Sequence, residues 1–214
     1  MNGLRLTAID GANPLGFLAA LGTLRLSALL WHTREIALAW ERSGHWVPVL
    51  SGLPELEPTE FCQQLLLAPP APVEAFEVLG KNLTVAPSSF VQFVDAMLAV
   101  ASPSDRRGVD FAAAFGSEVC KHETLDRIQY SSFSFITGSG HQDFLTTIGR
   151  LKEVVSEDHL FEALFDRWRN RDEKFSFRWD PLDAREYSLR WTNPSKEGSL
   201  TTWGANRLAF EALP

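Results

Sequence analysis

The chain has 214 residues, of which 45% are hydrophobic and 22% charged, so it can bury a core as one large domain or two small ones. Its net charge of −7 argues against a protein that coats nucleic acid nonspecifically, and any nucleic-acid contact must be local. The chain has no uncharged apolar run of about 18 residues and no secretory signal pattern, which argues against a membrane span and favours a cytoplasmic protein.

The residue usage is uneven. Fifteen Arg stand against five Lys, and seven Trp are many for this length. Arg binds phosphate and stacks on aromatic rings, so this composition suits a nucleic-acid site or a protein interface, although a GC-rich genome would give the same bias. Two cysteines, Cys62 and Cys120, fit unpaired thiols in a reducing compartment.

The chain opens with an expected strand over residues 4–9, a tight turn, and a long buried helix. Asn13 is suited to cap that helix and Pro14 to begin it. Gly16 and Gly22 weaken the helix, so we expect them to permit close approach of another backbone. An alternative is that the turn and the helix N-terminus also bind an anion such as phosphate.

The next elements are a hairpin over residues 35–50 and a short helix over 60–67. The proline-rich stretch 68–72 then predicts a subdomain boundary near residue 70 of an otherwise single domain, 1–214. Residues 73–85 fit either a helix or a strand, and a clear helix begins at Pro87. Arg106 and Arg107 open a further helix, which indicates either an anionic partner or two salt bridges.

Residues 128–136 predict a strand that runs into a Gly-Ser-Gly turn, followed by a helix over about 142–155. This junction would place three side chains at the turn, where they could face a ligand: Ser139, His141 and Gln142. The turn lacks the full G-x-S-x-G pattern of a hydrolase, so a plain turn is the other interpretation. The sequence predicts no metal site and no cofactor, because Cys120 and His122 have no further ligand pair.

An amphipathic helix is expected over residues 157–169, and alternating aromatic residues predict a second hairpin over 175–191. Asp183 and Arg185 lie in its connection, where an ion pair is the default and Arg185 is a candidate anion ligand.

The end of the chain repeats its beginning: residues 204–212 match residues 11–19 at six of nine positions. The repeat predicts that Asn206 caps a helix as Asn13 does, with Arg207 in the first turn. A cation there opposes the helix dipole, so Arg207 is expected either to pair with a carboxylate, for which Asp180 and Asp183 are candidates, or to bind an anionic ligand. Because the sequence stops shortly afterwards, we expect either a short tail or a longer protein.

Four stretches carry a resemblance: DGANPLGFLAALGTLR at 10–25, FITGSGHQ at 135–142, WDPLDAREYSLR at 179–190 and GANRLA at 204–209. Together they resemble type I-G (formerly I-U) CRISPR-associated proteins, above all the helicase-nuclease-extension family, and the first stretch is similar to the opening of the large subunits of that type. The resemblance carries over no catalytic residue, and the chain is far shorter than a typical large subunit.

These observations predict an α/β or α+β fold with a mixed or antiparallel sheet of hairpins covered by helices. The leading functional hypothesis is a non-catalytic subunit of a CRISPR effector in antiviral defence. It would bind other CRISPR effector proteins, and RNA or DNA, through a nucleic-acid or anion site listed here by residue: Asn13, Ser139, His141, Gln142, Arg185, Asn206 and Arg207. The alternative is a nuclease or hydrolase with a site near Ser139, His141 and Asp180.

Overall fold

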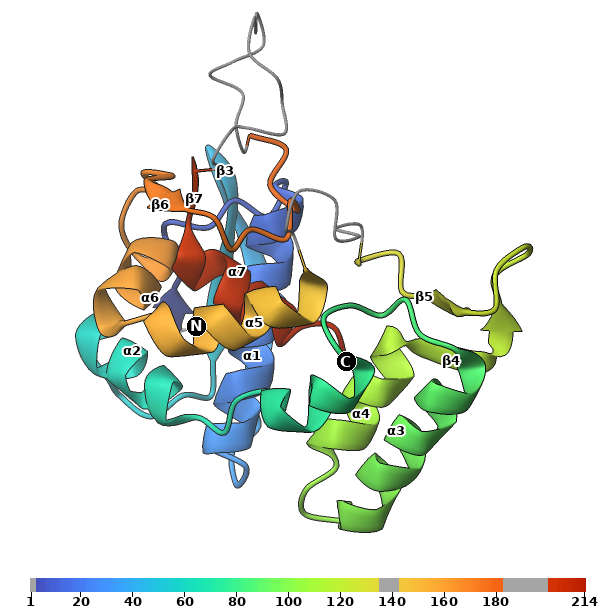
Figure 1. Ribbon diagram of the computed structural model, residues 1–214. Coiled ribbons are helices and arrows are strands. Elements are labelled where there is room, and N and C mark those ends of the chain that lie inside the picture. The colour runs from blue at the N-terminus through green and yellow to red at the C-terminus, as the bar shows by residue number, and fades with distance from the viewer. Residues whose placement is uncertain (1–2, 135–142, 183–199) are drawn as a thin grey trace, which may run out of the picture. The chain divides into compact units, whose positions relative to one another are not determined.

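The computed structural model describes residues 3–134, 143–182 and 200–214 (Figure 1). The chain separates into two compact units: unit 1 comprises residues 1–69 and 151–212, and unit 2 comprises residues 70–150 with the last two residues. Helices combine with small antiparallel sheets of two or three strands, which confirms the predicted α+β class. No helix among the described residues is long and apolar enough to span a membrane.

Unit 1 contains a three-stranded antiparallel sheet in the order β1-β3-β2. Strands β2 (Ala37–Ser43) and β3 (His45–Ser51) form the predicted hairpin, and Gly44 makes its turn with a φ of 79°. Strand β1 (Leu4–Arg5) is shorter than expected. After one further bond from the Leu6 N–H to the Pro48 carbonyl, the chain leaves the sheet, and the Ala8 N–H donates to the carbonyl of Leu164.

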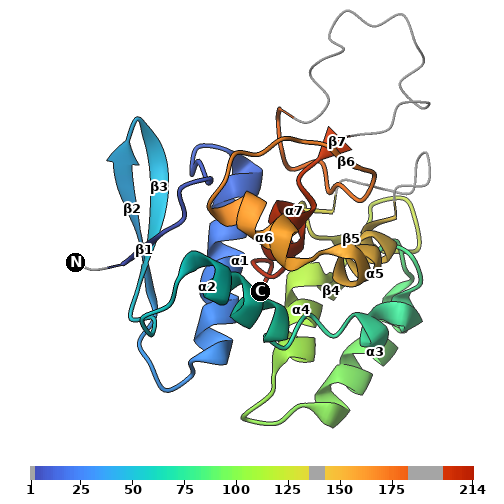
Figure 2. The same cartoon turned by 90° about the vertical axis from the view of Figure 1, so that its left-hand side faces the viewer.

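Helix α1 (Pro14–Leu30) begins and ends close to where the sequence predicts. The Asn13 side-chain oxygen accepts the backbone N–H groups of Leu15 at 2.9 Å and Gly16 at 3.3 Å, so the predicted cap is confirmed. Most of the helix surface is buried, which explains why its sequence lacks a polar face. In Figure 2 the β2–β3 hairpin lies on one side of α1 and α7 on the other.

Helix α7 (Trp203–Phe210) packs directly on α1, with α2 (Pro58–Leu67) and α6 (Glu157–Leu164) completing the helical part of unit 1. A Cβ added at Gly22 would lie only 1.8 Å from the carbonyl oxygen of Leu208. The expected close approach of another backbone at Gly22 is therefore confirmed. Gly204 does the same for α6, since a Cβ there would lie 2.1 Å from the carbonyl oxygen of His159.

The prediction of a strand over residues 175–179 is wrong. Here β6 (Asp172–Glu173) pairs with β7 (Leu200–Thr201), and the chain then follows an irregular path with positive φ at Lys174, Phe175 and Arg178. Such φ values are incompatible with a strand. The Phe177 N–H donates to the Asn206 side chain instead of a neighbouring strand, and residues 183–191 of the predicted hairpin lie outside the described residues.

Unit 2 is built around buried phenylalanines. Its elements are the 3₁₀ helix η1 (Val73–Leu79), α3 (Pro87–Val100), α4 (Arg107–Phe115), the strands β4 (Gly116–Lys121) and β5 (Ile128–Tyr130), and the first part of α5 (Phe144–Val154). The predicted strand over 128–136 thus ends early, at Tyr130. Phe76 contacts the rings of Phe93, Phe111 and Phe115 at centroid distances of 5.0–6.0 Å.

The basic pair at the start of α4 is held by acidic neighbours. Arg106 pairs with Asp110 at 3.4 Å, and Arg107 pairs with Asp105 at 2.7 Å. The hydrogen bond from the Arg107 side chain lowers the pKa of Asp105 from 3.8 to about 2. The two alternatives for this pair are therefore resolved in favour of salt bridges. The two thiols are unpaired, as predicted, with Cys62 buried and Cys120 exposed.

Candidate binding pocket

The structure describes three of the seven predicted site residues: Asn13, Asn206 and Arg207. Ser139, His141, Gln142 and Arg185 lie outside the described residues, as does Asp183. The three described residues have three different environments. The structure does not bring them together in one site.

Asn206 does not cap a helix. Thr202 precedes the first turn of α7, and Asn206 lies fully buried in the helix. Its amide nitrogen donates to the Thr201 hydroxyl at 2.9 Å, and its oxygen accepts the Phe177 N–H at 2.9 Å. Because a buried amide must find hydrogen-bond partners, Asn206 ties α7 to the irregular segment before residue 180. The prediction that Asn206 caps a helix is therefore wrong, and its buried amide already has hydrogen-bond partners within unit 1.

Arg207 lies in the last turn of α7, where a cation suits the helix dipole, and not in the first turn as predicted. Its guanidinium contacts the Glu211 carboxylate at 2.6 Å, and Arg25 of α1 contacts the same carboxylate at 3.2 Å. Glu211 is fully buried and the Arg207 side chain is 13% exposed. The ion-pair alternative is therefore correct, although the partner is Glu211. Asp180 bonds Asn13 instead, with 2.8 Å between the Asn13 amide nitrogen and the carboxylate oxygen.

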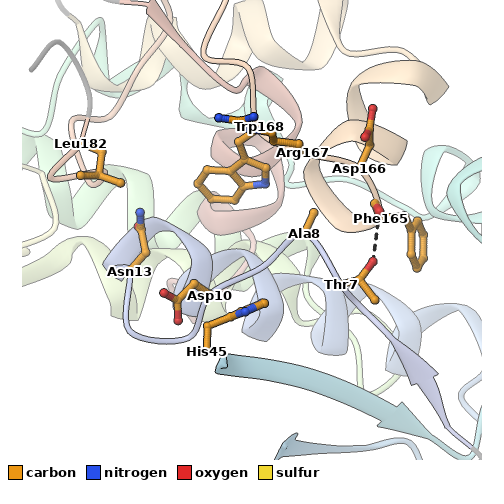
Figure 3. Close-up of a pocket in the computed structure, with 10 residues that line it drawn as sticks. All are labelled: Thr7, Ala8, Asp10, Asn13, His45, Phe165, Asp166, Arg167, Trp168 and Leu182. Atoms are coloured by element: carbon orange, nitrogen blue, oxygen red, sulfur yellow. Dashed lines mark hydrogen bonds between the residues drawn. The ribbon is translucent and has the colours of Figure 1, made fainter. Parts of the chain in front are cut away.

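Asn13 lines the one pocket that we describe, an open cavity of about 680 Å³ within unit 1 (Figure 3). Its wall comes from the loop before α1, the β2–β3 turn, the segment after α6, and Leu182. The lining residues are Thr7, Ala8, Asp10, Asn13, His45, Phe165, Asp166, Arg167, Trp168 and Leu182. Its volume is within the usual range for small-molecule and nucleotide sites.

Two sets of hydrogen bonds fix the pocket wall. The Gly11 N–H donates to the Trp46 carbonyl at 2.8 Å, and one Asp10 carboxylate oxygen accepts N–H groups from Ala12 and Trp46. On the other side, the Thr7 hydroxyl donates to the Phe165 carbonyl at 3.0 Å. These hydrogen bonds join the loop, the hairpin and the segment after α6 around the pocket.

The early end of α6 is what places Arg167 and Trp168 at the pocket. The N–H groups of Phe165 and Asp166 both donate to the Phe161 carbonyl, and the chain then leaves the helix. The sequence predicts a helix to residue 169, because Trp168 continues the apolar spacing. Because the sequence assigns Arg167 and Trp168 to this helix, it does not predict them as pocket residues, and no other local pattern marks them as such.

Some polar side chains of the pocket already have hydrogen-bond partners within unit 1, and one does not have a described partner. The Asp166 carboxylate is bonded to Arg169 at 2.5 Å, and the Trp168 indole N–H donates to the Ala163 carbonyl at 3.0 Å. Arg167 makes no hydrogen bond or ion pair with any other described residue. In Figure 3 the Trp168 ring and Arg167 lie on one side of the cavity, opposite Asp10 and His45. Arg167, which has no partner within residues 3–134, 143–182 and 200–214, therefore lies beside an aromatic ring.

The helix N-terminus beside the pocket does not offer a phosphate site. Pro14 has no N–H, the N–H groups of Leu15 and Gly16 are taken by the Asn13 side chain, and that of Phe17 by the Asn13 carbonyl. An anion would need unsatisfied donors there. Of the two alternatives at this junction, helix packing explains the residues, and an anion in the pocket would have to bind Arg167.

Ser156, His159 and Asp172 approach one another elsewhere in unit 1. The Ser156 hydroxyl lies 2.8 Å from Nδ1 of His159, whose Nε2 lies 3.9 Å from the Asp172 carboxylate. The same Nδ1 accepts the Ser156 backbone N–H at 3.1 Å, and the Ser156 side chain accepts the His159 N–H. This reciprocal pattern is a capping box that starts α6, so helix capping explains the geometry.

Metal chemistry has no support in the part of the chain that the structure describes, since no group of three or more His, Cys, Asp or Glu side chains there is placed to hold an ion. Comparison of the chain with protein families, curated proteins and solved structures gives no match.

Proposed function

We propose that this chain is a non-catalytic, cytoplasmic subunit of a CRISPR effector complex in antiviral defence, of type I-G, which binds nucleic acid and other CRISPR effector proteins. The sequence motifs support membership of such a complex. The observation that carries nucleic-acid binding is the Arg167 guanidinium, unpaired among the described residues, beside the Trp168 ring in an open pocket. Arg with an aromatic ring can bind a phosphate and a base together.

The charges around the pocket are compatible with this role despite the acidic chain. The Asp166 carboxylate is neutralised by Arg169, and one oxygen of Asp10 is already bonded to two backbone N–H groups. Arg167 then adds a positive charge with no partner among the described residues. A local site of this kind holds a short stretch of nucleic acid without the positive surface that a nonspecific coat requires.

The proposal is tested by measuring how labelled single-stranded and duplex oligonucleotides bind, using fluorescence anisotropy at several salt concentrations. Arg167→Ala should weaken binding and reduce the slope of log K against log salt by about one phosphate contact. Arg106→Ala is the matched control, because it removes an exposed Arg from unit 2 that is paired with Asp110. Absence of binding by the unaltered protein at low salt would overturn the nucleic-acid part of the proposal.

Membership of an effector complex needs a separate test. We expect CRISPR effector subunits to co-purify with the tagged chain from its native cells, with the complex identified by mass spectrometry. Purification of the chain without them would contradict that part of the proposal. No observation on the described residues favours the nuclease or hydrolase alternative, since the Asp180 carboxylate is bonded to Asn13 and to the Leu182 N–H.

A further inference from the structure

Two aromatic side chains beside the β2–β3 hairpin, Trp46 near its turn and Phe17 of α1, are unusually exposed. Trp46 is 46% exposed and Phe17 is 42% exposed. Phe17 lies one turn into α1 and stacks on Trp40 of β2, with 5.5 Å between ring centroids and an interplanar angle of 7°. Phe17 and Trp40 thus form a stacked pair of rings, and both Phe17 and Trp46 keep much of their surface in water.

The strand register places these rings on one face with a cation. Trp40 pairs with Pro48 and Arg42 with Trp46, so Trp40, Arg42 and Trp46 share a face of the hairpin. This is the face that Phe17 of α1 contacts. Arg42 is exposed and has no hydrogen bond or ion pair within the described residues. The face thus combines flat apolar surfaces with the positive charge of Arg42, which no described residue pairs.

The loop before α1 borders both the pocket and this face of Trp40, Arg42 and Trp46, which we call the aromatic face. A Cβ added at Gly11 would lie 2.4 Å from the Trp40 ring, so the loop before α1 runs directly against this ring. The same loop bonds the Trp46 backbone through Gly11 and Asp10. Asp10 of this loop lines the pocket opposite Trp168 (Figure 3). The loop therefore borders the aromatic face through Gly11 and the pocket through Asp10.

The exposed rings and the Arg side chains together indicate the chemical class of the ligand. A site with exposed aromatic rings, and with unpaired Arg side chains at the face and in the pocket, suits a partner that alternates flat rings with anionic groups. Single-stranded nucleic acid has this chemistry, because its unpaired bases can stack on aromatic side chains while its phosphates bind Arg. A duplex keeps its bases stacked inside and offers only phosphates and groove edges.

We propose that unit 1 binds single-stranded nucleic acid along this face, with bases stacked on Phe17 and Trp46, phosphates on Arg42 and Arg167, and one nucleotide in the pocket beside Trp168. The inference depends on the proposed function, and it specifies the strand state of the ligand and the residues that contact it. Its stacking contacts are sequence-tolerant, since every base has a flat face.

The test compares a single-stranded oligonucleotide of about ten nucleotides with the same sequence in a duplex. Trp46→Ala should weaken single-strand binding about tenfold with an unchanged salt slope, because it removes a stacking surface and no charge. Trp46→Phe should restore most of the affinity. Arg42→Ala should reduce the salt slope by about 0.7, the expected effect of one contact with a single strand.

Phe133→Ala is the matched control, because Phe133 is 45% exposed and belongs to unit 2. It should leave binding unchanged, and melting curves should show that all variants are folded. Duplex binding as tight as single-strand binding, or full affinity in Trp46→Ala, would overturn this inference. If Arg167→Ala still weakened binding in either case, the proposed function would stand. A loss of partner-protein binding alone in Trp46→Ala would assign the face to protein docking and overturn the inference.

Discussion

Replacing Gly22 with Ala should destabilise unit 1, although Ala is the better helix former. The new Cβ would lie 1.8 Å from the Leu208 carbonyl oxygen and 2.7 Å from the carbonyl carbon, whereas ordinary contacts begin near 3.4 Å. Both atoms belong to the backbone of α7, so no side-chain rotation can relieve the clash. Helices α1 and α7 must separate by more than an ångström, or the backbone of one must distort.

The size of the effect follows from two opposing contributions. Overpacking against a backbone costs about 3 kcal/mol, and separating the helices loosens buried contacts around Leu18 and Leu208 at a further cost of about 1 kcal/mol. Replacing Gly by Ala inside a helix returns about 1 kcal/mol. The free energy of unfolding should therefore fall by about 2–4 kcal/mol, which lowers the melting temperature by about 5–15 °C for a chain of this size.

Urea unfolding and calorimetry measure this change, and Gly149→Ala in α5 provides the matched control. A Cβ at Gly149 would lie 3.5 Å from a Val73 methyl group, which is an ordinary contact, so this variant should gain up to about 1 kcal/mol. Gly→Ala should therefore lower the free energy of unfolding at position 22 and raise it at position 149. If Gly22→Ala were as stable as the unaltered protein, the close approach of α1 and α7 would be refuted.

Three other predictions concern single side chains. Arg207→Ala breaks a buried ion pair and should lower the free energy of unfolding by about 3 kcal/mol while leaving oligonucleotide binding unchanged; weaker binding at equal stability would contradict this. Burial raises the pKa of the Cys62 thiol from 9.0 to about 12, so one thiol, Cys120, should react with a thiol reagent in the native protein and two in denaturant. Asn13→Asp keeps the cap but places a second carboxylate against Asp180, so urea unfolding should show a stability deficit at pH 7 that shrinks toward pH 4.

The parts of the fold that the sequence predicts correctly are those specified by local signals. Asn13 followed by Pro14 starts α1, and apolar alternation around Gly44 forms the hairpin. Long-range packing decides the parts that it predicts wrongly. Phe177 and Trp179 alternate as in a strand, but their burial comes from stacking on each other and on Phe210 at centroid distances of 4.5 and 5.5 Å. The alternation indicates burial, and only the backbone dihedrals exclude a strand.

The two copies of the Gly-Ala-Asn motif show why the site was harder to predict than the fold. The Asn13 side chain accepts N–H groups at the start of α1. The Asn206 side chain lies inside α7, where it donates to the Thr201 hydroxyl at the end of β7 and accepts the Phe177 N–H. Both copies have the sequence Gly-Ala-Asn, but α1 begins directly after its Asn, whereas α7 begins three residues before its Asn because it follows closely after β7. A one-turn change of this kind converts a surface cap into a core amide and moves Arg207 from the first turn to the last. The same sensitivity applies to α6, whose early end exposes Arg167 and Trp168. Candidate ligands near helix ends therefore depend on boundaries that tertiary contacts set, and the pocket residues follow from those contacts.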